Sequence, residues 1–433
     1  MSERLLIRGG TVIDPAQGYN GPGDVLVDNG VIAAVGQNLG ADGAKVIDAS
    51  GFIVAPGFVD MHVHLREPGE EYKEDIASGT RAAAAGGFTS VVCMANTRPP
   101  IDTEGLVRFV RERARTAGVV NVYPVAALTR GLEGKELTEA GSLRAAGAVA
   151  LSDDGHPVAD AELMRAAVQY AAMFALPVID HCQDPSLSAG GVMHQGYWST
   201  VLGLRGQPGE AEALQVARDV MLARLTGAHI HIAHVSSRYS VELIRRAKAE
   251  GLNITAEVTP HHLVLTDAIV NDMGYDTNTK TNPPVREEAD RRALREALRD
   301  GVIDAVATDH APHHQDDKLV EYDYAAPGIV GLETAVGLLN TELVETGWLD
   351  WERLVKAMSL APARMLGLRR GTLGVGEVAD ITVIDPSYRW VVDPHRFYSK
   401  SRNTPFAGRS LVGRAHMTIV AGHVVMQEGR VLE

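Results

Sequence analysis

Cysteine is scarce in this sequence of 433 residues, which contains only Cys93 and Cys182. Both fall inside runs that we predict to be strands, so they do not form the framework of a disulfide-rich secreted protein. No apolar run approaches the ~18 residues of a membrane-spanning helix. The start, MSERLLIRGG, lacks the apolar core of a signal peptide. We therefore expect a soluble cytoplasmic protein in a reducing compartment, with no membrane partner.

Positive charge is also in deficit. Lysine and arginine total 41 against 55 aspartates and glutamates, and the formal net charge is -14. Such a balance argues against nucleic acid or an anionic membrane as the main partner. A small anionic substrate is compatible with it only where the binding site is locally positive. The hydrophobic content of 45% and the charged content of 22% are ordinary for a globular protein.

The two ends of the chain share one pattern. Residues 4–14, 23–36 and 44–55 are short alternating runs broken by Gly, Asn and Asp, and residues 379–386 and 416–432 resemble them. Such runs are typical of strands joined by tight turns. We predict one small β-domain built from both termini, residues 1–55 and 366–433. Residues 56–365 would form a second, catalytic domain between them.

This middle part alternates between short apolar runs and longer amphipathic or alanine-rich stretches, such as 74–87, 160–175 and 240–251. The apolar runs are FVDMHVHL, TSVVCMAN, NVYPVAAL, AVALSDD, PVIDHC, HIHIAHV, NITAEVT and DAVATDH. Strands that alternate with helices indicate a parallel sheet, and eight of them favour an α/β fold of the (β/α)₈ barrel type. An open doubly wound sheet is the alternative. No G-x-G-x-x-G follows a strand, so its usual signature is missing.

Polar residues gather where these runs end. His62 and His64, two apart on one strand, point to the same face and can share a ligand. In a (β/α)₈ barrel the active site lies at the carboxyl ends of the strands. Five of the eight runs end in residues that can bind a metal ion. These are His62 and His64, Asp153 and Asp154, His181, His234, and Asp309.

The kind of ligand indicates the metal. Four imidazoles and two carboxylates without a thiolate cluster suit zinc or a similar ion. Six ligands are too many for one tetrahedral site that keeps a water. They fit two ions ~3.5–4 Å apart with one carboxylate bridging them. A hydroxide held between two such ions is a nucleophile at neutral pH.

Other polar residues near the strand ends have simpler interpretations. His229 and His231 have the opposite parity to His234, so we expect packing or hydrogen-bonding roles. His261 and His262 follow the seventh strand and are expected in a loop or behind the ligands. For Asp60 two interpretations are open: it is a ligand, or it accepts a hydrogen bond from a ligand imidazole.

The stretches DMHVHLREPG (60–69), MANTRPP (94–100) and ATDHAPH (307–313) resemble the amidohydrolase superfamily and, within it, the dihydroorotases. The resemblance covers nearly the whole chain, including the split β-domain. Dihydroorotases interconvert L-dihydroorotate and N-carbamoyl-L-aspartate by opening or closing a cyclic amide in de novo pyrimidine biosynthesis. The resemblance therefore implies a small-molecule substrate and two zinc ions per chain.

The resemblance also implies a role for each ligand. His62, His64 and Asp309 would hold one zinc, and His181 and His234 the other. Many relatives bridge the metals with a carboxylated lysine after the fourth strand, but AVALSDDG has no lysine. This pattern is similar to the branch that bridges with aspartate. The matching position is Asp154, and Asp153 is the alternative because neighbouring strand residues face opposite ways.

By the same resemblance Asp309 is the general acid/base. It would take a proton from the zinc-bridged hydroxide and deliver it to the leaving nitrogen. Arg66 would offer a planar fork to the substrate carboxylate, which supplies the local positive charge that the acidic chain needs. Segment 310–328 could close over the site as a lid. The full set of implied substrate contacts is His64, Arg66, Asn96, Asn282, His313, Pro327 and Gly328.

Two other functions are weighed against this one. Hydantoinases, dihydropyrimidinases and allantoinases share the fold, but they generally use the bridging lysine and their substrates lack this carboxylate. An inactive homologue that scaffolds a carbamoyltransferase should have lost some ligands, whereas all six candidates are present here. The sequence leaves open whether the chain forms a homo-oligomer and whether it binds an aspartate carbamoyltransferase.

Overall fold

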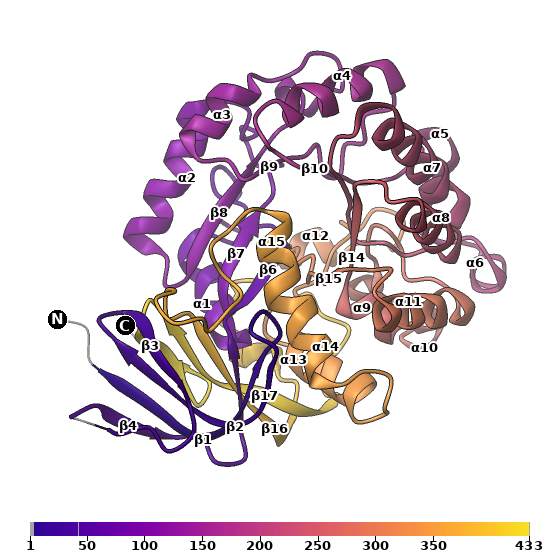
Figure 1. Cartoon of the computed structure of the whole chain (residues 1–433). Coiled ribbons are helices and arrows are strands. Elements are labelled where there is room, and N and C mark those ends of the chain that lie inside the picture. The colour runs from indigo at the N-terminus through magenta and orange to yellow at the C-terminus, as the bar shows by residue number, and fades with distance from the viewer. Residues whose placement is uncertain (1–3, 42, 433) are drawn as a thin grey trace.

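The predicted barrel is present. The computed structural model describes residues 4–41 and 43–432. Eight parallel strands follow one another in the order β6-β7-β8-β9-β10-β13-β14-β15, and helices surround them (Figure 1). Their bounds are β6 (Phe58–Val63), β7 (Phe88–Cys93), β8 (Asn121–Ala126), β9 (Ala150–Leu151), β10 (Val178–Asp180), β13 (Ile230–Ile232), β14 (Ile254–Val258) and β15 (Ala305–Val306). Each of the eight apolar runs contains one of these strands, so the (β/α)₈ prediction is confirmed.

The barrel closes between its first and last strands. The main-chain N–H of His64 donates to the carbonyl of His310 at 2.9 Å. Val63 and His310 also form a parallel bridge. Closure brings the residues after β15 next to those after β6, although about 245 residues separate them in the chain.

The three amphipathic stretches coincide with the helices α1 (Ile76–Gly86), α4 (Ala161–Ala172) and α8 (Arg238–Ala249). The Asp75 side chain accepts from the backbone N–H of Ser78 to cap α1, which stops where Gly87 adopts φ 91°. No helix in the described ranges is long and apolar enough to cross a membrane. The longer helices are α1 (Ile76–Gly86), α2 (Glu104–Ala117), α3 (Ala140–Ala146), α4 (Ala161–Ala172), α7 (Gly209–Thr226), α8 (Arg238–Ala249) and α11 (Glu288–Asp300). Shorter ones are α5 (Pro185–Ser188), α6 (Tyr197–Leu202), α9 (Pro260–Val264), α10 (Ile269–Asp272), α12 (Gln315–Lys318), α13 (Ala335–Leu339), α14 (Trp351–Val355) and α15 (Ala361–Met365).

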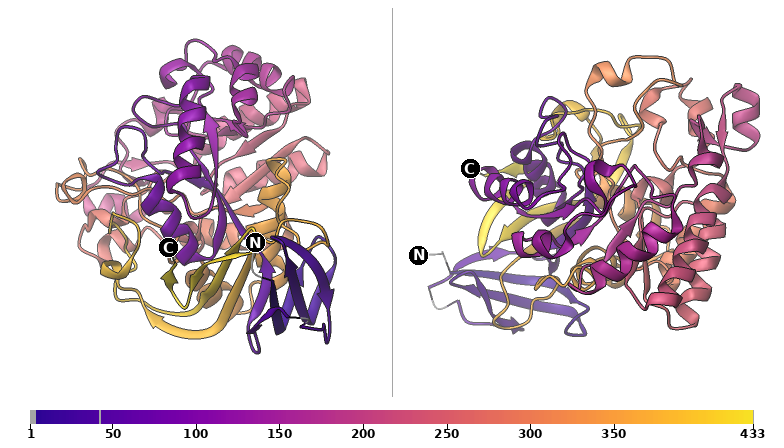
Figure 2. Two further views of the ribbon diagram at one scale, coloured as in Figure 1. Left: turned by 90° about the vertical axis from the view of Figure 1, so that its left-hand side faces the viewer. Right: turned by 90° about the horizontal axis from the view of Figure 1, so that it is seen from above.

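Both ends of the chain contribute to a second sheet, of nine strands, which lies to one side of the barrel (Figure 2). Its order is β19-β18-β17-β16-β5-β1-β2-β3, with β4 paired to β1. The bounds are β1 (Leu5–Asp14), β2 (Tyr19–Asp28), β3 (Val31–Gly36), β4 (Lys45–Asp48), β5 (Ile53–Pro56), β16 (Ile381–Val391), β17 (Ser410–Val420), β18 (His423–Gln427) and β19 (Arg430–Val431). The antiparallel pairing of β5 with β16 joins the two halves. We propose 1–55 with 366–433, and 56–365, as the domain limits.

Hydrogen bonds attach this sheet to the first barrel helix. The hydroxyl of Thr418 donates to the carbonyl of Ala84 at 2.7 Å, and that of Thr382 donates to the carbonyl of Gly87 at 2.6 Å. All four residues are buried. The sheet therefore supports the helix that connects β6 to β7.

Candidate active site

Asp154 lies at the centre of a cluster of imidazoles. Its Oδ1 is 3.4 Å from His62 Nε2, 3.4 Å from His181 Nδ1 and 3.5 Å from His234 Nε2. Its Oδ2 is 3.6 Å from His64 Nε2. His62 lies near the end of β6, and the other residues come shortly after β6, β9, β10 and β13. The carboxyl ends of four strands therefore meet at one carboxylate.

Asp309, after β15, completes one side of the cluster. Its Oδ1 lies 3.0 Å from His64 Nε2 and 3.7 Å from His62 Nε2. His181 and His234 lie on the other side, with 2.9 Å between His181 Nδ1 and His234 Nε2. The structure therefore brings all six predicted ligands together, and Asp154 lies between the two groups in the place of a bridging ligand.

The cluster suits metal ions better than hydrogen bonds. All six side chains are buried. His62 Nε2 and Asp154 Oδ1 have no hydrogen-bond partner within the described part of the chain, although buried polar atoms are normally paired. Imidazole nitrogens and carboxylate oxygens are the donors that zinc prefers when thiolates are lacking. The residues thus fit a binuclear zinc centre, in which His62, His64 and Asp309 would hold one ion and His181 and His234 the other.

Three further side chains determine which nitrogen faces the centre in three of the four imidazoles. Glu257 Oε1 lies 2.7 Å from His62 Nδ1, and Asn96 Oδ1 lies 2.9 Å from His64 Nδ1. Gln183 Oε1 lies 2.7 Å from His181 Nε2. Each oxygen accepts the proton of the outer nitrogen and leaves the lone pair of the inner nitrogen free.

Glu257 and Gln183, which contact His62 and His181, are not among the residues predicted from the sequence. Gln183 stands two residues after His181, the same spacing that identified the pair His62 and His64. Glu257 is a fully buried carboxylate inside the apolar run NITAEVT, an unusual position for an acid unless it is paired. Either signal could have identified them.

Asn96, expected to contact substrate, has both polar atoms engaged inside the site. Besides its contact with His64, its Nδ2 lies 3.2 Å from Asp154 Oδ2 and 3.3 Å from the Asp154 carbonyl. Asn282 Nδ2 lies 3.3 Å from His181 Nε2. Both amides therefore border the ligand cluster, and a substrate contact by either would be made beside the metal ligands.

The surrounding imidazoles control the charge of the carboxylates. Burial alone would raise the pKa of Asp154, but His62, His181 and His234 lower it well below its usual value. Burial would also raise the pKa of Asp309, but His64 and His62 lower it below its usual value. Both groups are therefore ionised at neutral pH, as a metal ligand must be.

The pKa of Glu257 is also lowered. Burial opposes the shift, but His62 and His231 bring the pKa to about 2. Glu257 is therefore an anion at neutral pH, where it can hold the Nδ1 proton of His62.

The backbone is strained at three positions of the site. Arg66, His234 and Asp309 have φ of 58°, 29° and 48°, a region that residues other than glycine seldom adopt. Such strain persists only where the surrounding structure enforces it, and it concentrates at functional sites. Here the strained residues are Arg66, His234 and Asp309, which all lie at the carboxyl ends of barrel strands.

Arg66 and the segment after β15 form one wall. The Nε of Arg66 donates to the carbonyl of Pro312 at 3.2 Å, and its Nη2 lies 3.3 Å from His313 Nε2. The same His313 nitrogen lies 3.0 Å from the carbonyl of Pro327. Burial and then the charge of Arg66 lower the pKa of His313 to about 2, so the imidazole is neutral. Arg66 is therefore the charged member of this pair.

Gly328 is required by the packing of this wall. Its φ is 135°, and a Cβ there would lie 2.7 Å from Ala311 Cβ and 3.1 Å from His313 Nε2.

Lys318, which is buried, donates to the carbonyl of Ala326 at 2.7 Å and to that of Thr277 at 3.0 Å. Segment 310–328 is therefore held down in this structure, and its role as a lid stays a prediction.

The neighbour of Asp154 faces away from the cluster. Asp153 Oδ1 accepts from the backbone N–H groups of Leu128 and Thr129 at 2.8 and 2.9 Å, and its other oxygen accepts from the Thr129 hydroxyl. Of the two aspartates, only Asp154 lies among the imidazoles, so we retain Asp154 as the proposed bridge.

The remaining candidates have structural contacts. His229 and His231 both bond the hydroxyl of Thr255, at 2.7 and 2.8 Å. Of the two places expected for His261 and His262, the loop is wrong. Both residues are buried in the short helix α9, because Pro260 at its first turn and the Thr259 cap start a helix there. A position behind the ligands stays a prediction.

Asp60 does neither of the things that the sequence suggested. Its carboxylate accepts from the backbone N–H groups of His62 and Thr308, at 3.2 and 3.1 Å. It therefore joins the ends of β6 and β15 through the main chain rather than through a ligand imidazole.

Comparison with known proteins shows the family of this chain. Residues 51–240 match the family model described as Dihydro-orotase-like, and residues 208–426 match that of the Amidohydrolase family. A dihydroorotase of Pelotomaculum thermopropionicum is 57% identical over 98% of this chain and 99% of its own length. One of Pelobacter propionicus is 54% identical over 97% of this chain and 99% of its own length. The chain belongs to the dihydroorotase family.

Solved structures of amidohydrolases share the fold of this member of the dihydroorotase family. The L-hydantoinase (dihydropyrimidinase) from Arthrobacter aurescens superimposes with a TM-score of 0.90 at 27% identity, covering 100% of this chain and 98% of its own. The D-hydantoinase from a Thermus species gives 0.85 at 28% identity, covering 99% and 96%. The predicted family and fold are thus confirmed, and amidohydrolases of this family are metal-dependent.

The contact between Glu257 and His62 leads to a testable prediction. In Glu257→Gln the anion that holds the Nδ1 proton of His62 is lost, so zinc affinity should fall by about 10–100-fold, the usual effect of losing such a partner. Competition with a chromogenic chelator measures the affinity. The exposed Glu345 provides the control Glu345→Gln, which should bind zinc normally. Equal affinity in both variants would reduce Glu257 to a packing role.

Proposed function

We propose that this chain is a dihydroorotase, a hydrolase that reversibly opens the cyclic amide of L-dihydroorotate to N-carbamoyl-L-aspartate. The observation that carries the proposal is the buried guanidinium of Arg66 beside the cluster of six ligands. A cyclic amide that bears a carboxylate needs a hydrolytic centre and a cation next to it. The dihydroorotases that align with the whole chain at 50–57% identity support the same reaction.

Six residues would hold two zinc ions, with Asp154 between them. When bound, the ions would make a hydroxide nucleophile available at neutral pH and polarise the ring carbonyl. The protein contributes the fixed geometry. Glu257, Asn96 and Gln183 orient three of the imidazoles, and burial excludes competing water.

Asp309 would move the proton. Its carboxylate is ionised at neutral pH because His64 and His62 lower its pKa. Asp309 accepts the proton released when the nucleophile attacks the ring carbonyl, and it then delivers that proton to the ring nitrogen as the C–N bond breaks. In the direction of ring closure the same carboxyl group removes the proton from the attacking nitrogen.

Arg66 would bind the carboxylate of the substrate. Its Nε is engaged with Pro312, while Nη2 reaches only a neutral His313. The guanidinium therefore retains donors for an anion, and a planar fork can bind both carboxylate oxygens. His313, Pro327 and Gly328 would line the same end of the substrate.

Replacing Arg66 by lysine should not be a mild change. A bidentate fork becomes a single point charge, and the contact with Pro312 is lost as well. We expect kcat/KM for L-dihydroorotate to fall on the order of 10²-fold. Steady-state kinetics with Arg98→Lys as a control tests this, because Arg98 is exposed. Unchanged kinetics in Arg66→Lys would assign Arg66 a structural role.

One assay separates this function from its alternatives. The purified, zinc-loaded protein should hydrolyse L-dihydroorotate, and the loss of the ultraviolet absorbance of this substrate measures the rate. The protein should act far more slowly on hydantoin and dihydrouracil, which lack the carboxylate. The opposite preference would make the chain a hydantoinase-type enzyme. No hydrolysis of any of the three would favour an inactive scaffold. Self-association and association with an aspartate carbamoyltransferase stay predictions that sedimentation can test.

A further inference from the structure

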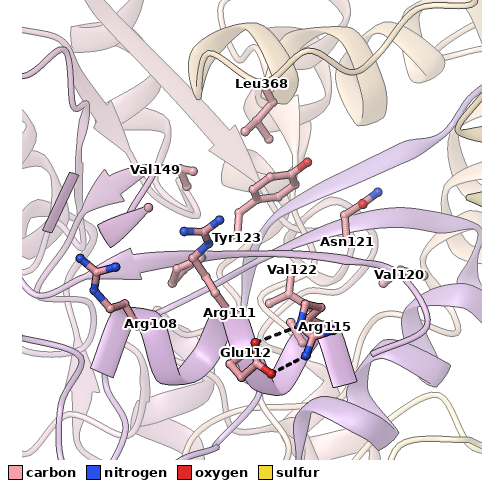
Figure 3. Close-up of a pocket in the computed structure, with 13 residues that line it drawn as sticks. Arg108, Arg111, Glu112, Arg115, Val120, Asn121, Val122, Tyr123, Val149 and Leu368 are labelled. Carbon is pink, nitrogen blue, oxygen red and sulfur yellow. Dashed lines mark hydrogen bonds and ion pairs between the residues drawn. The ribbon is translucent and has the colours of Figure 1, made fainter. Parts of the chain in front are cut away.

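A cavity of about 750 Å³ lies on the opposite side of the barrel from the ligand cluster. Residues 121–124, which begin β8, line it, and so do Gly147 and Val149, which precede β9. Asp154 follows the other end of β9. Helix α2 forms the outer wall (Figure 3). A volume of this size is typical of sites for small organic ligands.

Three arginines give the outer wall its charge. Arg108, Arg111 and Arg115 stand three and four residues apart on α2, and therefore share one face of the helix. Arg115 is paired with Glu112 by two hydrogen bonds of 2.7 and 2.9 Å. Glu112 is the only carboxylate among the residues that line the cavity.

The other two guanidiniums are largely free to bind an anion. Arg108 approaches Glu104 at 3.7 Å, but both side chains are exposed and such a pair contributes little. Arg111 has no carboxylate partner in the described part of the chain, and its Nη1 donates to the carbonyl of Ala146 at 2.9 Å. One nitrogen is thus anchored to the backbone, while the remaining donors can turn to the cavity.

Gly147 makes room for this arrangement. Its φ is 113°, and a Cβ there would lie 2.7 Å from Arg111 Nη1 and 2.8 Å from Arg111 Cδ. A larger residue would push Arg111 away from the carbonyl that holds it. The glycine that ends α3 therefore also determines the position of the guanidinium.

The inner wall is apolar and carries one aromatic ring. Figure 3 shows Arg111 extending from α2 towards Tyr123, with Val149 and Leu368 nearby, and Arg108 on the same helix. Val120, Val122 and Pro124 also line the cavity. A simple inorganic anion would leave this wall uncovered. A flat ring could pack on Tyr123 while an attached anion reached the arginines.

We propose that this cavity binds a nucleoside di- or triphosphate, with the phosphates on Arg108 and Arg111 and the base against Tyr123 and the apolar wall. Arginine forks match phosphate oxygens in two-point hydrogen bonds. The chain carries a net charge of -14, so a cavity with two unneutralised arginines is a local exception that favours a polyanion. The site is independent of the proposed reaction, since none of these residues approaches the ligand cluster.

Calorimetric titration of the full-length, zinc-loaded protein with ATP, at low and at physiological salt, tests the proposal. We expect saturable binding that weakens with salt. Arg111→Met keeps the length of the side chain but removes the charge, and should weaken ATP binding by about 10-fold or more. Arg108→Met should weaken it by a smaller factor. Arg299→Met is the matched control, because Arg299 is exposed and pairs only with Asp300.

Pyrophosphate is the second probe. If the base contributes, pyrophosphate should bind at least ~10-fold more weakly than ATP, because it cannot cover the apolar wall. Equal affinities would overturn the part of the proposal that concerns the base. The Arg111→Met variant should hydrolyse L-dihydroorotate at the normal rate, so a failure here is distinguishable from a failure of the proposed reaction.

Three results would overturn the proposal. The first is the absence of saturable binding of ATP. The second is binding that Arg111→Met and Arg108→Met leave unchanged, because ATP would then occupy another site. The third is a loss of self-association in Arg111→Met without nucleotide binding, measured by sedimentation, since the cavity would then be covered by a second copy of the chain.

Discussion

Asp309→Asn should lose at least ~10²-fold, and up to ~10⁴-fold, in kcat for L-dihydroorotate, the usual contribution of a positioned acid–base group. Asparagine keeps the shape and one oxygen donor, but its amide cannot take up a proton at neutral pH. The variant should retain much of its metal, because His62 and His64 remain on the same side of the cluster. A nearly unchanged melting temperature would show that the fold is intact.

The pH dependence separates the two roles of Asp309. Its pKa is lowered from the usual value, so the carboxylate is available as a base at neutral pH and is lost only as the pH falls. The hydrolysis rate of the native chain should therefore drop at low pH. The low-pH part of the pH–rate profile should change in Asp309→Asn. His62→Ala should instead fail by losing metal. If Asp309→Asn retained both its zinc and near-normal turnover, the base would be another residue.

The second large effect is expected at Asp154. This carboxylate approaches four imidazoles within 3.4 to 3.6 Å. Asp154→Asn removes the negative charge that lies between the two groups of ligands. We expect the loss of at least one ion per chain and a fall in kcat of roughly 10³-fold, since metal stabilisation of the transition state amounts to several kcal/mol.

Asp153 provides a matched control one residue away. It accepts backbone N–H groups of Leu128 and Thr129, and burial raises its pKa to about 6. Asp153→Asn should lower the melting temperature but keep the metal and most of the activity. Metal content and kcat, measured for both variants, decide which of the two aspartates binds the metal. If Asp153→Asn lost its metal and Asp154→Asn kept it, the bridging residue would be Asp153.

Much of this site follows from two periodicities in the sequence. The alternation of apolar and amphipathic runs predicts the barrel, and the barrel places all strand ends at one rim. The spacing of His62 and His64 then predicts that they converge. The choice between Asp153 and Asp154 does not follow from these periodicities, because β9 is two residues long and its register cannot be read from such a short run.

Contacts between distant strands could not be predicted in this way. Glu257 meets His62 across 195 residues, and Arg66 meets His313 across 247. The sequence around one residue of each pair does not indicate which residue it contacts. The arginines of α2 likewise have the spacing of an ordinary solvated helix, and only the packing of α2 against β8 and Gly147 shows that two of them border a cavity.

We propose that Asp154 joins two metal ions into one hydrolytic centre, and a zinc titration of the metal-free protein tests this most directly. Activity on L-dihydroorotate is measured after each addition, and bound metal is determined by elemental analysis. The account predicts that activity rises until about two zinc ions are bound per chain and then stays constant. Full activity at one bound ion per chain would contradict it.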